Sequence, residues 1–151
     1  MNAPCPVAMS GFRRRMPSKL EEVDAACLQL REFCRTQGWE ESAFGIELVV
    51  RECLNNAILH GNGRDPGKLV SMEMVSRPPW LRLQVTDQGK GFDWRSRMGR
   101  GLPEDDKPCG RGLLIADAYT RRVRFNPSGN QITLWFQQGP SSHRNRATYD
   151  R

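Results

Sequence analysis

The chain has 151 residues, of which 38% are hydrophobic and 26% are charged, and its formal net charge is +6 at pH 7. This length fits a single domain, and the composition excludes a wholly disordered chain. No segment approaches the ~20 consecutive apolar residues of a membrane-spanning helix, and the first ten residues lack the cation and the apolar core of a signal peptide, so we expect neither membrane insertion nor secretion.

The positive charge permits nucleic-acid, phosphate or acidic-protein partners without selecting one of them. The arginines are scattered along the chain, which favours solvated strand faces over a dedicated basic site. The five cysteines form no C-x-x-C pair and only two histidines are present, so a zinc site has almost no support. This use of cysteine is typical of the reducing cytoplasm, which is the predicted location.

The first predicted helix spans residues 19–37. Ser18 and Glu21 have the spacing of a capping box, in which the two side chains satisfy N–H groups at a helix start. Gly38 supplies a stop. The apolar residues between these signals recur at helical spacing: Leu20, Val23, Cys27, Leu30 and Cys34. The pattern indicates an amphipathic helix, preceded by a short edge strand over residues 12–16.

A second helix is predicted over residues 43–60, and Gly61-Asn-Gly63 ends it. It is apolar nearly all round, with Ile46, Leu48, Val49, Val50, Cys53, Leu54, Ala57, Ile58 and Leu59. Such a helix is buried deeply or covered on two sides. Burial in the core and burial against a partner subunit explain this pattern equally well.

The second half of the chain predicts two hairpins and a third helix. Apolar and polar residues alternate in four strands, over residues 70–74, 81–85, 123–125 and 132–136. A long Gly- and Arg-rich stretch at 88–111 separates the hairpins, and residues 113–119 form a helix. This order predicts an α+β fold, a two-layer α/β sandwich with helices on one face of a mostly antiparallel, mixed sheet. The domain covers residues 10–138, with flexible termini at 1–9 and 139–151.

Two polar residues of the second helix are candidates for chemistry. Glu52 and Asn56 lie four residues apart, so they share one face beside the apolar stripe. Their oxygens suit a Mg²⁺ ion or an attacking hydroxyl group. A polar helix edge facing solvent explains the pair as well, when it is taken alone.

A second candidate follows the strand at 81–85. Alternation places Asp87 on the inward face, where a carboxylate is costly unless it is hydrogen-bonded. Gly89 and Gly91 allow the backbone to approach a flat ligand, and the amine of adenine would satisfy the carboxylate. A plain turn with an aspartate at its start is the alternative.

A third candidate opens the last helix. Gly110, Arg111, Gly112 and Leu113 begin it, and the free N–H groups of a glycine-rich helix start can bind phosphate. Glycines also occur at helix starts for packing reasons, so this signal is weak by itself.

Together these features resemble the GHKL ATPases, and most closely the anti-sigma-factor serine-protein kinases of bacterial partner-switching systems. The resemblance covers residues 10–137. The run Glu52–Gly61 is similar to the N box of that family, Asp87–Asp93 to its first glycine box and Gly110–Ile115 to its second. Gly129–Thr133 is similar to its final strand. The implied fold is the Bergerat ATP-binding fold.

The resemblance implies a role for each matching position. Asn56 would bind Mg²⁺, Glu52 would orient or deprotonate the attacking serine hydroxyl, and Asp87 would read the adenine amine. Gly89, Gly91 and Thr133 would shape the base pocket, while Gly110, Arg111, Gly112 and Leu113 would hold phosphates. Residues 93–110 would form a lid over ATP, with Arg95, Arg97, Arg100, Lys107 or Arg111 near the transferred phosphate.

The expected function is that of a cytoplasmic, Mg·ATP-dependent protein-serine kinase. Its implied substrate is a STAS-domain antagonist of the anti-anti-sigma type, and it would sequester a sigma factor or a similar regulator. The resemblance also implies a homodimer. Two alternatives stay open: a histidine-kinase-type catalytic module, and a nucleotide-binding or nucleic-acid-binding module without kinase activity. No known nucleic-acid motif and no basic groove interleaved with aromatic residues are evident, so no direct nucleic-acid binding is expected.

Overall fold

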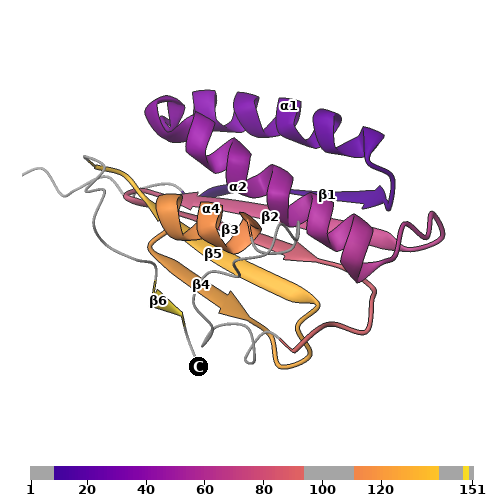
Figure 1. Cartoon of the computed structure of the whole chain (residues 1–151). Coiled ribbons are helices and arrows are strands. Elements are labelled where there is room, and N and C mark those ends of the chain that lie inside the picture. The colour runs from indigo at the N-terminus through magenta and orange to yellow at the C-terminus, as the bar shows by residue number, and fades with distance from the viewer. Residues whose placement is uncertain (1–8, 94–110, 140–147, 150–151) are drawn as a thin grey trace, which may run out of the picture.

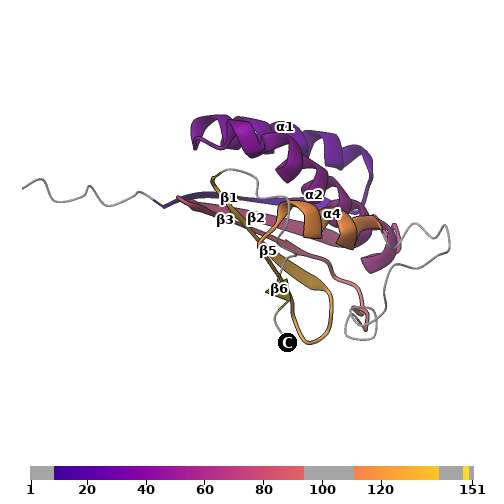
Figure 2. The same cartoon turned by 60° about the vertical axis from the view of Figure 1, so that its left-hand side comes forward.

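The computed structural model of the chain describes residues 9–93, 111–139 and 148–149. They form two layers, in which the helices lie on one face of a six-stranded sheet (Figure 1). After a 60° turn, all the helices of the described residues are again seen on this one face of the sheet (Figure 2). The predicted α+β sandwich is therefore confirmed.

The strands are β1 (Ser10–Pro17), β2 (Leu69–Arg77), β3 (Trp80–Thr86), β4 (Arg122–Phe125), β5 (Gln131–Gln137) and β6 (Thr148–Tyr149). Their order in the sheet is β1-β2-β3-β5-β4-β6. All neighbouring strands are antiparallel except β4 and β6, so the sheet is mixed, as predicted. The two predicted hairpins are β2–β3 and β4–β5.

The helices are α1 (Glu21–Thr36), α2 (Ala43–Asn56) and α4 (Arg111–Tyr119), with a short 3-10 turn, η1 (Glu40–Ser42), before α2. The chain continues beyond α2 in a wide π turn, η2 (Ala57–Gly61), where the Asn62 N–H donates to the Ala57 carbonyl at 2.8 Å. Among the described residues, no helix is both long and apolar enough to cross a membrane.

The core lies between the helices and the sheet face that they cover. Alternation places Leu83 of β3 on this face, in register with Met74 of β2 and Leu134 of β5, and all three are fully buried. A buried polar pair completes the packing, because the Trp39 indole N–H donates to the Ser76 hydroxyl at 2.9 Å. Burial in this core explains the main apolar stripe of α2, whereas Leu48 is half-buried and Phe44 is 72% exposed.

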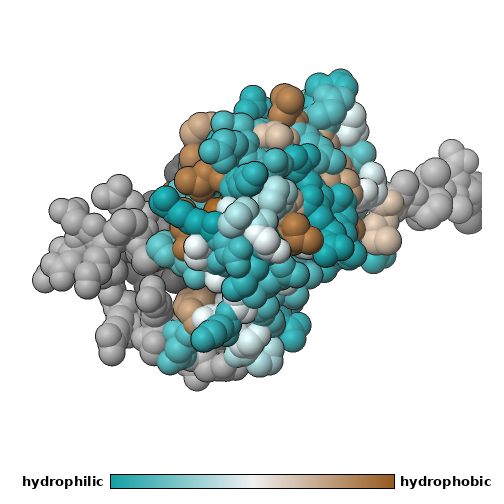
Figure 3. All heavy atoms as spheres, turned by 90° about the vertical axis from the view of Figure 1, so that its right-hand side faces the viewer, coloured by the Kyte–Doolittle hydropathy of each residue, from teal (hydrophilic) through white to brown (hydrophobic). Residues whose placement is uncertain are grey.

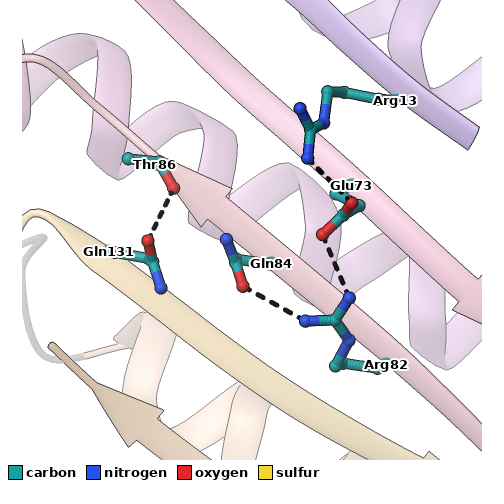
Figure 4. A network of polar contacts seen from close by, with 6 residues as sticks. All are labelled: Arg13, Glu73, Arg82, Gln84, Thr86 and Gln131. Atoms are coloured by element: carbon teal, nitrogen blue, oxygen red, sulfur yellow. Dashed lines mark hydrogen bonds and ion pairs between the residues drawn. The ribbon is translucent and has the colours of Figure 1, made fainter.

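The opposite face of the sheet is polar and carries a chain of charged side chains (Figure 4). Glu73 accepts from Arg13 and from Arg82, each at 3.0 Å, and Arg82 donates further to Gln84 at 3.3 Å. Exposed ion pairs of this kind add little to stability, but they keep the open face soluble. The side of the molecule seen in Figure 3 is also mainly hydrophilic, with only isolated hydrophobic groups.

Two local expectations differ from the structure. The capping box is wrong: α1 begins at Glu21 without any side-chain cap, because Ser18 is buried and its hydroxyl donates to the Lys68 carbonyl at 3.0 Å. The predicted flexible tail contains a strand, since the Thr148 N–H donates to the Arg121 carbonyl at 3.0 Å and β6 pairs with β4.

Candidate functional site

A cavity of about 210 Å³ lies where the end of α2 meets the ends of β3 and β5. Glu52 and Asn56 of α2 line it together with Asp87 and Gly91, which follow β3. The structure thus brings together residues from the first two candidate motifs, which lie far apart in the sequence. The volume is below the roughly 300–1,000 Å³ of typical small-molecule pockets, so it suits a base-sized group whose remainder extends outside.

The helix α2 fixes the position of Glu52 and Asn56 one turn apart. Between and after them, Cys53 and Ala57 are buried and also line the cavity, so this wall is apolar. Burial raises the pKa of the Cys53 thiol to about 12, with the Glu52 charge adding to the effect. Glu52 is half-buried and Asn56 is exposed, so both can meet the polar part of a ligand at the rim of an apolar pocket.

Asp87 lines the cavity from the turn that follows β3. Its N–H donates to the Asn130 carbonyl at 2.9 Å, and its Oδ1 accepts from the Gly89 N–H at 2.7 Å. Burial raises the pKa of this carboxyl above its ordinary value, and the Gly89 N–H and the Lys68 charge offset only part of the rise. A half-buried carboxylate held in place by backbone bonds is a ready acceptor for an amine on a bound base.

Glycines permit the close approach on which this turn depends. A Cβ on Gly61 would overlap the Asp87 carboxylate, so only glycine fits opposite that side chain. Gly91 has a φ of +77°, a left-handed conformation, and packs directly against the Ser128 carbonyl. The two glycines let three separate segments, the end of η2, the Asp87 turn and the β4–β5 turn, meet around the cavity.

The β4–β5 turn supplies wall residues that the sequence did not single out. Asn130 lines the cavity, and its Nδ2 donates to the Asp87 carbonyl at 3.0 Å, in return for the bond described above. Phe125 contacts Phe92 edge-to-face with 5.4 Å between ring centroids, and both rings line the cavity. The turn residues at 126–130 carry a recognisable turn signal, but nothing local indicates that they contact Asp87.

Thr133 is not brought into the cavity. It pairs with Gln84 of β3 and Arg124 of β4, which places its side chain on the open face of the sheet. Its neighbour Ile132 faces the helices and lines the cavity instead. We therefore give Thr133 no role in shaping the base pocket.

The third motif is described only in part. α4 starts at Arg111 and continues through Gly112 and Leu113, and further along this helix Ala116 is buried and lines the cavity. The helix whose start was predicted to bind phosphate therefore also contributes a residue to the cavity wall. Gly110 and the predicted lid, with the cations Arg95, Arg97, Arg100 and Lys107, lie outside the described residues.

The donor set fits a metal ion only together with a phosphate ligand. Within residues 9–93, 111–139 and 148–149, no group of three or more His, Cys, Asp or Glu residues could hold a metal by itself. Mg²⁺ commonly takes one or two protein oxygens and completes its shell with water and substrate phosphates. Asn56 beside Glu52 is compatible with that arrangement.

Comparison with known proteins agrees with this geometry. Residues 16–136 match the family model described as the histidine kinase-like ATPase domain. The anti-sigma F factors of Geobacillus stearothermophilus and Geobacillus kaustophilus are each 29% identical to the chain over 92 residues. That of Anoxybacillus flavithermus is 28% identical over 92 residues. Each alignment covers 58% of this chain and 62% of the relative, so the match spans less than two thirds of these relatives.

Proposed function

The chain belongs to the histidine kinase-like ATPase family, and we propose that it is an ATP-dependent protein-serine kinase that also sequesters a regulatory protein. The family membership confirms the resemblance to the GHKL ATPases that the motifs indicated. The observation that carries the proposal is the meeting of Glu52, Asn56 and Asp87 around one cavity. An inward carboxylate can recognise the purine, and a polar helix face can contact the phosphates. These two features are the minimum that binding of ATP requires.

Phosphoryl transfer depends on positioning and charge neutralisation more than on covalent chemistry. In the proposed complex Asp87 accepts a hydrogen bond from the adenine amine, while the base packs against the apolar wall. Asn56 holds Mg²⁺, which neutralises charge on the phosphates. Glu52 accepts the proton of the attacking serine hydroxyl or orients that hydroxyl toward the terminal phosphoryl group. The helix start at Arg111–Leu113 supplies N–H groups to the phosphates.

A transfer assay tests the assignment of Glu52. Wild type, Glu52→Ala and Glu52→Gln are incubated with labelled Mg·ATP and a candidate STAS-domain protein from the same genome. The proposal expects transfer by wild type, with a loss of at least 100-fold in both variants and near-normal ATP affinity in Glu52→Gln. Equal transfer by wild type and Glu52→Ala would show that the role given to Glu52 is wrong.

The partners are proposed from the relatives, which are named anti-sigma F factors. We propose a STAS-domain protein as substrate and a sigma factor or similar regulator as the sequestered partner, within the cytoplasm. We also propose that the active form is a homodimer, which light scattering with ATP present would test. A pull-down from native cells, done once with ATP and once with ADP, would identify both partners and show whether the nucleotide switches between them.

A further inference from the structure

Asn62 is a buried polar residue that does not itself line the cavity. It follows the π turn directly, is 3% exposed, and uses both ends of its amide. Its Nδ2 donates to the Ser18 hydroxyl at 2.7 Å and to the Leu69 carbonyl at 3.0 Å. Its Oδ1 accepts from the Gln88 N–H at 2.7 Å. One side chain thus joins the start of α1, the start of β2 and the turn after β3.

Gln88, the residue after Asp87, hydrogen-bonds both to Asn62 and to Leu69, the residue whose carbonyl Asn62 also contacts. Gln88 gives its backbone N–H to Asn62, and its side-chain Oε1 accepts from the Leu69 N–H at 2.7 Å. Asn62 and Gln88 therefore form a closed set of hydrogen bonds around Leu69, called the clasp below. The clasp holds the turn on the side toward β2, while Asn130 holds Asp87 itself on the side toward β5.

We propose that Asn62 is a positioning residue for base recognition, which fixes the Asp87 carboxylate through the clasp to Gln88. This inference rests on the proposed function, in which Asp87 reads the amine of adenine. Gly61 and Asn62 are consecutive, so one short segment both leaves room for the carboxylate and anchors the residue that follows it. A carboxylate fixed in this way discriminates an amine, as in ATP, from the carbonyl that GTP presents at the same ring position.

The Gln88 N–H donates to the Asn62 Oδ1, so the position of this turn depends on the Asn62 amide. Removing the amide leaves that N–H and the Leu69 carbonyl without this partner, and the turn relaxes toward solvent. A hydrogen-bonding site rejects the wrong base because the polar groups of the site would be left unpaired with it. If the Asp87 carboxylate is displaced, the site loses this selectivity for adenine over guanine. At metal sites, groups that hold a ligand residue in place typically affect affinity by roughly ten- to a hundred-fold, and we expect an effect of similar size here.

The experiment compares Asn62→Ala with Ser18→Ala in the full chain. Ser18→Ala removes another bond of Asn62, at a buried site, but leaves its bond to Gln88 intact. Calorimetry measures the affinities for Mg·ATP and Mg·GTP, urea unfolding measures stability, and hydrogen exchange measures protection of the Gln88 amide without nucleotide. We expect Asn62→Ala to weaken ATP binding at least ten-fold, narrow the ATP-over-GTP preference and accelerate Gln88 exchange.

Ser18→Ala separates positioning from a general loss of stability. We expect it to lower stability while leaving ATP affinity within about two-fold and Gln88 exchange unchanged. The proposal is overturned if Ser18→Ala weakens ATP binding as much as Asn62→Ala does. It is also overturned if Asn62→Ala changes neither Gln88 exchange nor the preference for ATP.

Two further measurements cover the cases in which Asn62→Ala does not fold or wild type binds no nucleotide. If Asn62→Ala does not fold, Asn62→Leu removes the same acceptor of the Gln88 N–H with a side chain of similar size, and an unchanged ATP affinity in that variant overturns the proposal. If wild type binds no nucleotide, the proposed function fails independently. Hydrogen exchange then decides alone whether Asn62 holds the turn, with unchanged Gln88 protection counting against it.

Discussion

Gly61 faces the carboxylate of Asp87 so closely that no side chain fits between them. The two residues come from different segments, the end of the π turn and the turn after β3. Their contact sets how far the carboxylate projects into the cavity, because a group at position 61 would displace it.

Replacing Gly61 with alanine is expected to push the Asp87 carboxylate away from its position and weaken nucleotide binding by at least ten-fold. The cost arises in the site, since the residue has an ordinary backbone conformation and needs no left-handed φ. Isothermal calorimetry with Mg·ATP measures the effect. Gly67→Ala is the matched control: Gly67 lies in the next turn, outside the cavity, and should leave affinity unchanged.

We expect Asp87→Asn to weaken nucleotide binding without lowering the stability of the fold. Because burial raises the pKa of Asp87, the ionised carboxylate is the costly form in the folded protein. That cost is fully present above the raised pKa and disappears as the pH falls below the pKa of the unfolded chain. The variant should therefore be at least as stable as wild type to urea at pH 7, with an advantage that shrinks in acid.

Asp65→Asn provides the control for that measurement. Asp65 accepts from the Gly67 N–H at 2.9 Å, the same local bond that Asp87 makes with Gly89, but its side chain is exposed. It should show neither a gain in stability nor a loss of nucleotide affinity. A clear destabilisation by Asp87→Asn at pH 7 would mean that the hydrogen bonds to the carboxylate outweigh its burial.

Base binding should weaken in acid. As the pH falls through the raised pKa of Asp87, the carboxylate takes up a proton and becomes a poorer acceptor for the amine. Adenosine is the suitable ligand because it carries no phosphate group to titrate. Affinity is measured from pH 7 downward for wild type and Asp87→Asn, and only wild type should lose affinity as the pH approaches the raised pKa. Parallel curves for the two proteins would contradict this assignment.

The buried bond between Trp39 and Ser76 predicts a coupled effect on stability. Ser76→Ala leaves the indole N–H unsatisfied in the core, which should cost about 1–3 kcal/mol in urea unfolding. In a Trp39→Phe background the donor is absent, so the same substitution should cost much less. Equal costs in the two backgrounds would show that the bond contributes no specific stability.

The three cysteines that are buried in the described part of the chain should be inert in the folded protein. Burial raises the pKa of Cys34 to about 11 and that of Cys53 to about 12, and it also raises the pKa of Cys27. The reactive thiolate is then scarce at pH 8. Peptide mass spectrometry after iodoacetamide treatment should find these three residues unmodified in buffer and modified in urea. Rapid labelling of Cys53 in buffer would indicate that the cavity wall opens.

Much of the fold follows from periodicity in the sequence. Helices were predicted over residues 19–37 and 43–60 and two hairpins after them, because apolar residues recur with a clear period of 3.6 or 2. The structure has the first helix at Glu21–Thr36 and the second at Ala43–Asn56, where the predicted helix continues as a π turn. Asp87 was also predicted to face inward, since it continues the alternation of β3. The order of motifs then gave the family, which the comparison confirmed.

What the sequence missed depends on contacts between distant segments. Ser18 has the spacing of a cap, but the Lys68 carbonyl and the Asn62 amide engage its hydroxyl instead. Asn62 itself carries no local signal, because its partners lie on three other segments. Thr133 illustrates the opposite case: alternation with Ile132 already places its side chain outward, and the resemblance to the family overrode that pattern.

The π turn at the end of α2 makes the identity of the glycine in this stretch more important than the number of residues. A wide turn holds one residue more than an ordinary α-helical turn of the same rise. Deleting one residue between Ala57 and Gly61 would leave an ordinary helical turn of about the same rise, so the segment that follows would keep roughly its present direction. Glycine would then still face the carboxylate, so homologues that retain the same pocket are expected to tolerate loss of one residue in this turn more readily than replacement of the glycine.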